Sequence, residues 1–343
     1  MENESLKFTI WVTTDCNMKC KYCYEGNDKQ KYYMDKHTAE STVEYLKEQL
    51  KVLDVKSCIV HFHGGEPLLA FDIIQYIMGK LEKDLPRNID VHYSITTNAS
   101  ILNGTIKRFL LDKFHTISVS IDGNKKSHDS MRTFRDGRGT HEIALKNSIS
   151  LAGERNSLRI RMTVTPENVA DLSENIIFLV NMGFTYISPQ IDFFSKTWTE
   201  EHISRLEQEL TYTSNYLKNT NKSFLSINLV NKNRVYSMGA CTGGIYSFNI
   251  DPTGKIFPCT FTVGKDEFII GNIFNGLYKE KISEIQKLNK QCVQDCFGCS
   301  YYKYCITSMC KLVNKCITGD FLKAPPILCA IENLKIRMRS IKA

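Results

Sequence analysis

The sequence lacks any run of 18 apolar residues, the length that a helix needs to cross a bilayer, and so it excludes a membrane-spanning protein. It also lacks the basic start and the small-residue cleavage site of a signal peptide, because Met1–Lys7 starts acidic and leads directly into the β-rich Phe8–Val12. Hydrophobic residues at 42% and charged residues at 24% exclude a disordered chain. We therefore expect a folded cytoplasmic protein with no membrane partner.

A dense block of one charge sign is also missing. The 44 Lys and Arg against 37 Asp and Glu give a net charge of +7, but the basic residues are scattered through helix-like stretches. This distribution is typical of solvated helix faces, so we expect no nucleic-acid partner. The length of 343 residues predicts two domains, or one barrel of about 250 residues with an appendage.

Cysteine is absent from residues 59–240, although the whole chain contains 13. A disulfide scaffold would not leave more than half of the chain empty and crowd both ends, and disulfides rarely persist in the cytosol. Three cysteines lie within residues 16–23 and nine within residues 241–329. This pattern favours metal or redox chemistry. The remaining Cys58 lies in a strand pattern and is interpreted as a small core residue.

Strand-like and helix-like segments alternate over the first 190 residues. The expected strands are Phe8–Thr13, Cys58–His63, Ile89–Thr97, His115–Asp122, Leu158–Thr165 and Tyr186–Ile191. The expected helices are Met34–Leu53, Phe71–Leu81, Ile106–Phe114, His141–Ala152, Val169–Met182 and, further on, Glu200–Asn219. Six β-then-α steps imply an α/β fold with a parallel sheet, either doubly wound or barrel-like. The chemically conspicuous residues fall where strands end, which favours a partial (β/α)6 TIM-like barrel.

The pattern changes after residue 221. Ile245–Asn249 and Lys255–Pro258, joined by a Pro- and Gly-containing turn, predict a β-hairpin. The region after Ile273 is interpreted as helix-poor and cysteine-dense, with a final helix at Glu332–Ser340. We therefore expect a barrel of residues 1–195, a bridging helical segment of residues 196–240, and a cysteine-rich domain with a C-terminal helix over residues 241–343.

Cys16, Cys20 and Cys23 form a Cys-x3-Cys-x2-Cys run in one expected loop after the first strand. Three thiolates this close together suit a [4Fe–4S] cluster in which one iron has no protein ligand. Such an open position indicates chemistry rather than a structural role, as it does at zinc sites. A structural zinc site would need a fourth ligand nearby, and the nearest histidine, His37, lies beyond a charged stretch.

This triplet, with Tyr22 directly before its last cysteine, resembles the signature of the radical S-adenosylmethionine (radical SAM) superfamily. The resemblance implies that the amino and carboxylate groups of SAM chelate the unique iron. It further implies that an electron from the cluster cleaves SAM to methionine and a 5′-deoxyadenosyl radical, which abstracts a hydrogen atom.

Gly64-Gly65-Glu66-Pro67 follows the second expected strand and resembles the motif that binds the SAM amino group in this family. Glycines at a strand end let the backbone approach a ligand closely, and Glu66 offers an acceptor for an ammonium. On its own, the same tetrapeptide could form any turn. The other SAM-binding residues that the resemblance implies are Tyr22, Thr97, Asn98, Ser120 and Arg132. A guanidinium suits the SAM carboxylate, although Arg132 could also be a surface-loop arginine.

The C-terminal cysteines resemble the SPASM domain, which adds two auxiliary [4Fe–4S] clusters to a radical SAM barrel. By this resemblance the ligands of the nearer auxiliary cluster are Cys241, Cys259 and Cys310, and those of the outer one are Cys296, Cys299, Cys305 and Cys329. The expected cofactors are therefore three [4Fe–4S] clusters and SAM. Cys-x2-Cys pairs also occur in zinc ribbons, so a zinc-binding interaction module is the alternative from a different class.

The sequence departs from the family pattern in four respects. Four residues, rather than three, separate Cys305 from Cys310, and Ser308-Met309 replace the usual Gly-Gly. Two extra cysteines, Cys292 and Cys316, are potential ligands, and only three obvious ligands serve the nearer auxiliary cluster. That cluster could have an open iron for a substrate thiolate, or one of the extra cysteines could close it.

Most SPASM enzymes in this family modify peptides or proteins, which implies a ribosomal-peptide maturase. Sulfatase maturases have a general-base Asp after the cysteine equivalent to Cys259, whereas this chain has Thr260, whose hydroxyl cannot accept a proton at neutral pH. Asp192, Asp266 or Glu267 could substitute for that base.

We expect hydrogen abstraction from a precursor peptide and a thioether product, with carbon–carbon crosslinking and formylglycine formation as alternatives. The family implies a flavodoxin- or ferredoxin-type electron donor. Because the first cysteine motif begins at residue 16, we expect a separate protein or the barrel surface to read any leader sequence.

Overall fold

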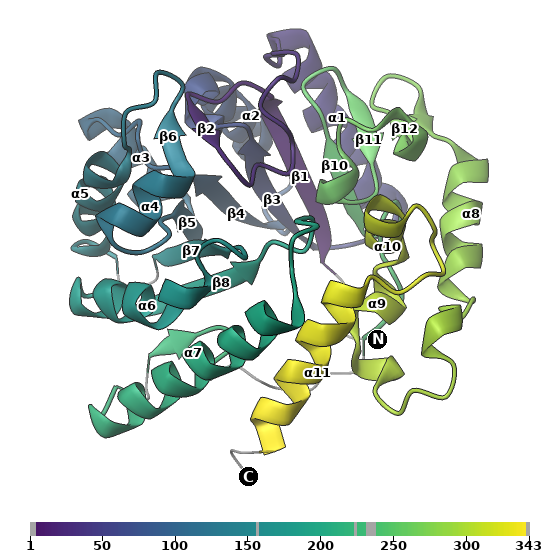
Figure 1. Cartoon of the computed structure of the whole chain (residues 1–343). Helices are drawn as coiled ribbons and strands as arrows, with labels where there is room; N and C mark the ends of the chain where they lie inside the picture. The colour runs from purple at the N-terminus through teal and green to yellow at the C-terminus, as the bar shows by residue number, and fades with distance from the viewer. Residues whose placement is uncertain (1–4, 156–157, 223–224, 231–237, 341–343) are drawn as a thin grey trace.

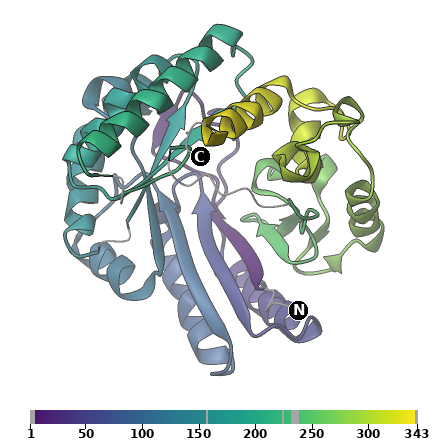
Figure 2. The same cartoon turned by 90° about the horizontal axis from the view of Figure 1, so that it is seen from below.

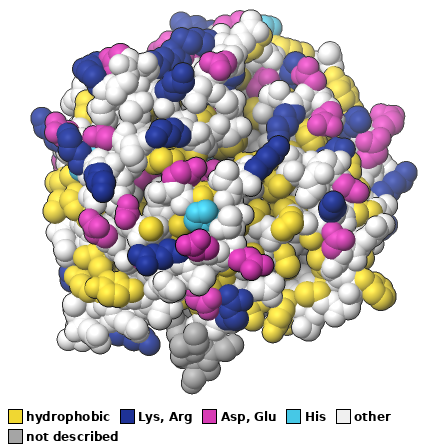
Figure 3. All heavy atoms as spheres, in the orientation of Figure 1, with side chains coloured by type: hydrophobic (Ala, Val, Ile, Leu, Met, Phe, Trp, Pro, Cys, Tyr) yellow, Lys and Arg dark blue, Asp and Glu magenta, His cyan; other side chains and the backbone are white. Residues whose placement is uncertain are grey.

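The computed structural model describes residues 5–155, 158–222, 225–230 and 238–340. Residues 223–224 and 231–237 of the predicted bridging segment lie outside these ranges. Within the described part of the chain, no helix is long and apolar enough to cross a membrane. Figure 3 shows Lys and Arg side chains interspersed with Asp and Glu over the visible face, in line with the scattered charge of the sequence.

Six parallel strands that follow one another in sequence also lie side by side in the sheet. They are β1 (Leu6–Thr13), β3 (Ser57–Gly64), β4 (Asp90–Thr97), β5 (Thr116–Ser120), β7 (Arg159–Val164) and β8 (Tyr186–Ile191). A doubly wound sheet would reverse its strand order at a switch point, and this sheet does not. The predicted partial barrel is therefore confirmed (Figure 1).

Helices cover the outer face of these strands, as Figure 2 shows. They are α1 (Lys36–Val52), α2 (Phe71–Asp84), α3 (Gly104–Lys113), α4 (Lys125–Met131), α5 (His141–Ala152), α6 (Leu172–Asn181) and α7 (Glu200–Asn219). Several helices begin at a side chain that caps the free backbone amides, as Asp35 does for α1 and Asn103 for α3. Two short strands, β2 (Met18–Cys20) and β6 (Arg132–Phe134), form a separate antiparallel pair.

The C-terminal domain continues the barrel sheet. The predicted hairpin is formed by β10 (Ser247–Ile250) and β11 (Lys255–Phe257), and β10 pairs in parallel with β1 from Lys7↔Ser247 to Ile10↔Ile250. The sheet then ends with β12 (Gly271–Asn272) and β13 (Gly276–Leu277). At the opposite edge, β9 (Ser226–Ile227) pairs with β8. In Figure 2 this domain, coloured green to yellow, lies next to β1.

The expectation that the region after Ile273 is helix-poor is wrong. It contains α8 (Lys279–Asn289), α9 (Ile306–Met309), α10 (Lys311–Thr318) and α11 (Pro326–Ser340). The helices between the cysteines are short, and the thiols interrupt the apolar periodicity that would reveal them. The last helix begins at Pro326 rather than Glu332, because proline fits the first position of a helix.

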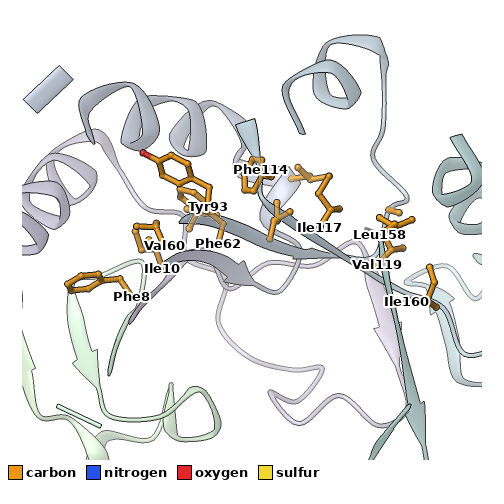
Figure 4. Close-up of a cluster of buried hydrophobic side chains, with 14 of the residues drawn as sticks. Phe8, Ile10, Val60, Phe62, Tyr93, Phe114, Ile117, Val119, Leu158 and Ile160 are labelled. Carbon is orange, nitrogen blue, oxygen red and sulfur yellow. The ribbon is translucent and has the colours of Figure 1, made fainter. Parts of the chain in front are cut away.

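The hydrophobic core lies between the sheet and its helices, not inside the barrel. On β3, residues Cys58, Val60 and Phe62 are buried on the helix side, and Figure 4 shows Val60 and Phe62 clustered there with Tyr93 and Phe114. The alternate positions of β3 and β7 are only partly buried and face the lumen, so strand and helix layers pack without filling it. Barrel interiors are commonly filled by branched apolar side chains. Here the lumen is left for polar groups.

Phe248 of β10 packs the C-terminal hairpin against the N-terminal part of the barrel. Its ring stacks on Phe8 of β1 at 5.5 Å and meets Tyr45 of α1 edge-on at 5.9 Å. We predict that Phe248→Ala destabilises the fold by about 3–5 kcal/mol, the usual cost of removing a buried aromatic ring. Anaerobic urea unfolding followed by circular dichroism measures the effect. Tyr212→Ala, on the 60% exposed ring of Tyr212 in α7, is the matched control and should change stability by less than about 0.5 kcal/mol. Equal effects of the two substitutions would contradict this packing role.

Candidate functional site

A cavity of about 740 Å³ opens at the carboxyl ends of the barrel strands and extends into the lumen. This volume is typical of a small-molecule site. The cavity brings together all the residues predicted for the amino-terminal cluster and for SAM: Cys16, Cys20, Tyr22, Cys23, Gly64, Gly65, Glu66, Thr97, Asn98, Ser120 and Arg132. These residues come from five separate segments of the chain, and the barrel topology is what makes them neighbours.

Two glycines fasten the cysteine loop to the end of β3. A Cβ on Gly64 would lie 2.1 Å from the carbonyl oxygen of Thr13, and one on Gly65 would lie 2.2 Å from that of Asp15. Gly64 also has φ of 138°, which favours glycine. The backbone N–H of Gly65 donates to Thr13 O at 3.1 Å, and that of Glu66 donates to Asp15 O at 2.8 Å. The close approach predicted for a ligand is therefore made to the backbone that leads into Cys16.

Glu66 is only 1% exposed and is held by the ends of β3 and β4. Its Oε1 accepts from Thr97 Oγ1 at 2.6 Å, and its Oε2 accepts from the backbone N–H of Asn98 at 2.7 Å. Burial raises the pKa of Glu66, whereas these hydrogen bonds favour the charged form and lower it. The arrangement fixes a carboxylate beside the cysteine loop, where it can accept an ammonium group.

A closed ring of side-chain hydrogen bonds ties the cysteine loop to the end of β4. Asn98 Nδ2 donates to Asn17 Oδ1 at 2.9 Å, Asn17 Nδ2 donates to Ser100 Oγ at 2.8 Å, and Ser100 Oγ donates to Asn98 Oδ1 at 2.6 Å. Asn98 Nδ2 also lies 3.9 Å from Cys16 Sγ. The sequence pointed to Asn98 alone, because Asn17 and Ser100 meet only through the tertiary fold.

Arg132 is placed beside the cysteine loop by the β2–β6 pair, in which Cys20 is opposite Arg132. Its Nη1 donates to the Tyr22 hydroxyl at 2.7 Å, and that hydroxyl donates to Asp122 Oδ2. Asp122 Oδ1 accepts from the backbone N–H of Thr163 at 2.9 Å. Tyr22 and Asp122 therefore position the guanidinium, and the surface-loop interpretation of Arg132, which is 7% exposed, is wrong.

The residues present fit SAM and a cluster with an open iron. The Nε of Arg132 is buried without a hydrogen-bond partner in the described structure, so a donor is free for a carboxylate across the cavity from Glu66. Burial raises the pKa of Cys16 to about 11 and also raises the pKa values of Cys20 and Cys23. Over the described ranges, no three Cys, His, Asp or Glu side chains converge on a single metal ion.

The structure gathers the cysteines predicted for the nearer auxiliary cluster. Burial, with the nearby thiols of Cys259 and Cys241, raises the pKa of Cys310 to about 12. Burial, with Cys241 and Cys316, raises the pKa of Cys259 to about 11. Such charge effects need short distances between thiols, so Cys241, Cys259 and Cys310 lie near one another, and Cys316 lies near Cys259.

The cysteines predicted for the outer cluster form a second group. Burial raises the pKa of Cys296 to about 11, and Cys305, Cys299 and Cys329 contribute to that rise. Cys305 and Cys299 likewise raise the pKa of Cys329, after burial. Each of the four predicted ligands is therefore close to others of the set.

The two extra cysteines lie at the border of these groups. Cys316 Sγ lies 3.8 Å from the carbonyl oxygen of Phe261; burial raises the pKa of Cys316, and Lys265 lowers it. Cys292 is exposed, and its Sγ lies 3.5 Å from its neighbour's carbonyl oxygen, that of Val293.

The three candidate bases are placed differently. Asp192 follows β8 and lines the cavity, and burial raises its pKa. Asp266 pairs with Lys255 at 3.0 Å on the surface, and Glu267 is exposed, so neither lines the cavity. Thr260 does line it and donates to Asn249 Oδ1 at 2.9 Å.

An aromatic cluster that sequence reasoning missed joins the cysteine loop to the C-terminal domain. Tyr24 packs on Phe194 at 6.4 Å and on Phe261 at 5.4 Å, and Phe193 contacts both phenylalanines at 4.9 and 5.2 Å. All four rings line the cavity. The rings come from three segments that are distant in sequence, so no local sequence pattern predicts the cluster.

Comparisons with known proteins agree with this geometry. Residues 10–176 match the Radical SAM superfamily. An uncharacterized protein of Methanocaldococcus jannaschii is 32% identical over 180 residues, which cover 52% of this chain and 59% of that relative. The chain thus spans less than two thirds of that relative's length. A cysteine-type anaerobic sulfatase-maturating enzyme of Clostridium novyi is 23% identical over 86% of this chain and 84% of its own.

Solved structures show the same fold. Native anSMEcpe with bound AdoMet and the Cp18Cys peptide superposes with a TM-score of 0.80 at 20% identity, covering 98% of this chain and 97% of the other. Streptococcus suis SuiB bound to the precursor peptide SuiA superposes with a TM-score of 0.69 at 18% identity, covering 95% and 76%. The fold match includes the C-terminal domain as well as the barrel.

We predict that Arg132→Gln weakens SAM binding roughly 10- to 100-fold, because it removes a charged hydrogen-bond donor facing a carboxylate. Equilibrium dialysis of SAM against the reconstituted protein measures this change, and iron content should stay unaltered. Arg138→Gln, in the same segment but 77% exposed, is the matched control and should bind SAM normally. Normal SAM affinity in Arg132→Gln would refute the assignment.

Proposed function

We propose that the chain, a radical SAM enzyme of the SPASM type by its similarities, is a maturase that forms a thioether in a precursor peptide. One observation carries the proposal. The cavity that holds the predicted SAM-binding residues is also lined by Thr260 and Phe261, which directly follow Cys259 of the nearer auxiliary group. Both cysteine-bearing parts of the chain therefore border one reaction chamber.

The residues of the barrel would hold SAM and the amino-terminal cluster. Cys16, Cys20 and Cys23 would bind the cluster, Glu66 would take the amino group of SAM, and Arg132 would take its carboxylate. Together the two cofactors would supply a 5′-deoxyadenosyl radical that abstracts a substrate hydrogen atom. Tyr22 would act as a positioning residue, since its hydroxyl links Arg132 to Asp122.

The walls of the chamber suit a radical reaction, because the rings of Tyr24, Phe193, Phe194 and Phe261 shield one side from water. Asp192 lines the same cavity and accepts from the backbone N–H of Phe194. Burial raises its pKa, which favours proton uptake by this carboxylate.

Two similarities support a peptide as the substrate. The solved structures that share this fold include anSMEcpe with a bound peptide and SuiB with its precursor peptide. The lumen below the cysteine loop is open and polar, so it offers room and hydrogen bonds for an inserted peptide side chain.

The cysteine arrangement favours a thioether as the product. Cys241, Cys259 and Cys310 would hold the nearer auxiliary cluster, and a cluster with three protein thiols has a fourth position for a thiol of the substrate. Cys316 is the alternative ligand for that position, because it also lies close enough to Cys259 to raise the pKa of that thiol. A low-potential flavodoxin- or ferredoxin-type donor and a separate leader-binding protein complete the proposal.

The second candidate is formylglycine formation, which is favoured by the similarity to the Clostridium novyi sulfatase-maturating enzyme over 86% of the chain. Thr260 weighs against it, since its hydroxyl is engaged with Asn249 and is no base at neutral pH. Carbon–carbon crosslinking is the third candidate and needs no fourth thiol position.

Mass spectrometry of a cysteine-containing precursor peptide, encoded beside this chain, tests the proposal directly. We predict a product that has lost two hydrogen atoms and whose thiol no longer reacts with an alkylating reagent. The same loss with a reactive thiol would show a carbon–carbon link instead, and conversion of cysteine to an aldehyde would show formylglycine.

Two variants test the three-thiol arrangement. Cys310→Ser should lose about four irons per chain and the crosslinked product, because it removes one of the three gathered thiols. Cys316→Ser is the matched control and should keep both. Loss of iron in Cys316→Ser would mean that this cysteine closes the cluster, and the thioether proposal would then be wrong.

A further inference from the structure

The lumen of the barrel contains more positive charge than the described structure balances. Lys7 on β1 and Arg159 and Arg161 on β7 all line the cavity below the cysteine loop. Each of the three lies near His61, a lumen residue of β3, and lowers the pKa of that histidine. Among the described residues, none of the three cations has a carboxylate within 4.0 Å.

The hydrogen bonding of Arg159 is also incomplete. The Nε of Arg159 is buried with no partner in the described structure, and the guanidinium instead stacks over the Tyr186 ring at 4.8 Å. A buried donor without an acceptor is costly unless a ligand supplies one. Arg159 and Arg161 lie on one strand, and a planar guanidinium can bind a carboxylate through two parallel hydrogen bonds.

The acidic groups of the cavity are committed elsewhere. Glu25 pairs with Lys29, and Glu66 accepts from Thr97 and Asn98. Asp192 lies beyond the end of β8 and accepts from the backbone N–H of Phe194 at 3.0 Å. The cations near the mouth, Lys31 and Arg135, both pair with Asp15. Apart from Arg132, which is assigned to the SAM carboxylate, the unpaired cations of the cavity among the described residues lie in the lumen.

His61 and His63 in the lumen are neutral, so they form hydrogen bonds without adding charge. Burial, followed by the neighbouring cations, lowers the pKa of His63 to about 3 and brings that of His61 well below its usual range. His63 Nδ1 accepts from the backbone N–H of Gly64 at 2.8 Å, so its proton is on Nε2. His61 is held by Ser94 at 2.8 Å and Thr96 at 3.3 Å.

We propose that Arg161, Arg159 and Lys7 form a carboxylate-binding site in the lumen that anchors the substrate peptide below the reacting position. The proposal rests on the proposed function for the peptide nature of the substrate. The carboxylate is either an acidic side chain or the carboxyl terminus of the peptide.

The length of β7 beyond Arg161 sets the distance between the carboxylate-binding site and the reacting position. Arg161 lies three residues before the end of β7 at Val164, which is about 10 Å along the strand. The cysteine loop borders the cavity at that end of the sheet. An extended peptide covers the same span in about three residues. The anchoring carboxylate therefore lies within about three residues of the attacked carbon.

Binding of three tripeptides to the reconstituted, SAM-loaded enzyme tests the site, and the first two are blocked at both ends. One has a central glutamate, the second a central glutamine, and the third the same glutamine with a free carboxyl terminus. Isothermal titration calorimetry should show that a carboxylate peptide binds at least about tenfold more tightly than the neutral one. Whichever of the two acidic peptides binds identifies the source of the carboxylate.

Arg161→Gln should remove this preference, and Arg161→Lys should restore part of it. Arg108→Gln, on the 81% exposed Arg108 of α3, is the control and should keep it. The SAM dissociation constant is measured for every variant. Equal affinity for the acidic and neutral peptides in the wild type would overturn the proposal. So would a loss of SAM affinity in Arg161→Gln, because the arginine would then serve the cofactor.

Failure of this inference is distinguishable from failure of the proposed function. If Arg161→Gln crosslinks the genuine precursor with an unchanged KM, the lumen site is wrong and the maturase proposal stands. If no precursor is crosslinked but the carboxylate preference depends on Arg161, the maturase proposal is wrong and the lumen site stands.

Discussion

The close approach of Gly64 and Gly65 to the backbone of residues 13–15 is the constraint on which the site depends. Two backbone hydrogen bonds, from Gly65 to Thr13 and from Glu66 to Asp15, hold the ends of β1 and β3 together. Any side chain at either glycine would overlap a carbonyl oxygen. These bonds fix both the start of the cysteine loop and the position of Glu66. The predicted cluster ligands and the carboxylate predicted for the SAM amino group are therefore positioned by the same backbone contacts.

The two faces of the barrel sheet have different roles: the outer face forms the hydrophobic core, and the inner face lines the cavity. Apolar side chains on the outer face of the strands, such as Val60 and Phe62, pack against the helices and form the core. The alternate positions face a polar lumen that bears the cations of β1 and β7. The β10 strand then extends the sheet beyond β1, and the segment after its hairpin brings Thr260 and Phe261, which directly follow Cys259, to the same chamber.

The main elements could be predicted because they are long and strongly patterned, as β3 and α7 are. Short elements such as β2, β6 and α4 carry too few residues for a periodic signal. The residues predicted for the SAM site lie in local motifs and line one cavity, whereas Asn17, Ser100 and the rings around Phe194 meet only through tertiary contacts. Asp266 was a candidate base because it is close to Cys259 in sequence. The structure instead places it on the surface, where it pairs with Lys255.

The central claim is that the amino-terminal cysteine loop holds a cluster with an iron open to SAM, fixed between Glu66 and Arg132. The most direct measurement is the electron paramagnetic resonance spectrum of the anaerobically reconstituted, reduced protein with and without SAM, together with release of 5′-deoxyadenosine. The account predicts that SAM alters the spectrum of one cluster and that strong reductant then releases 5′-deoxyadenosine. A spectrum indifferent to SAM, with no 5′-deoxyadenosine formed, would contradict it.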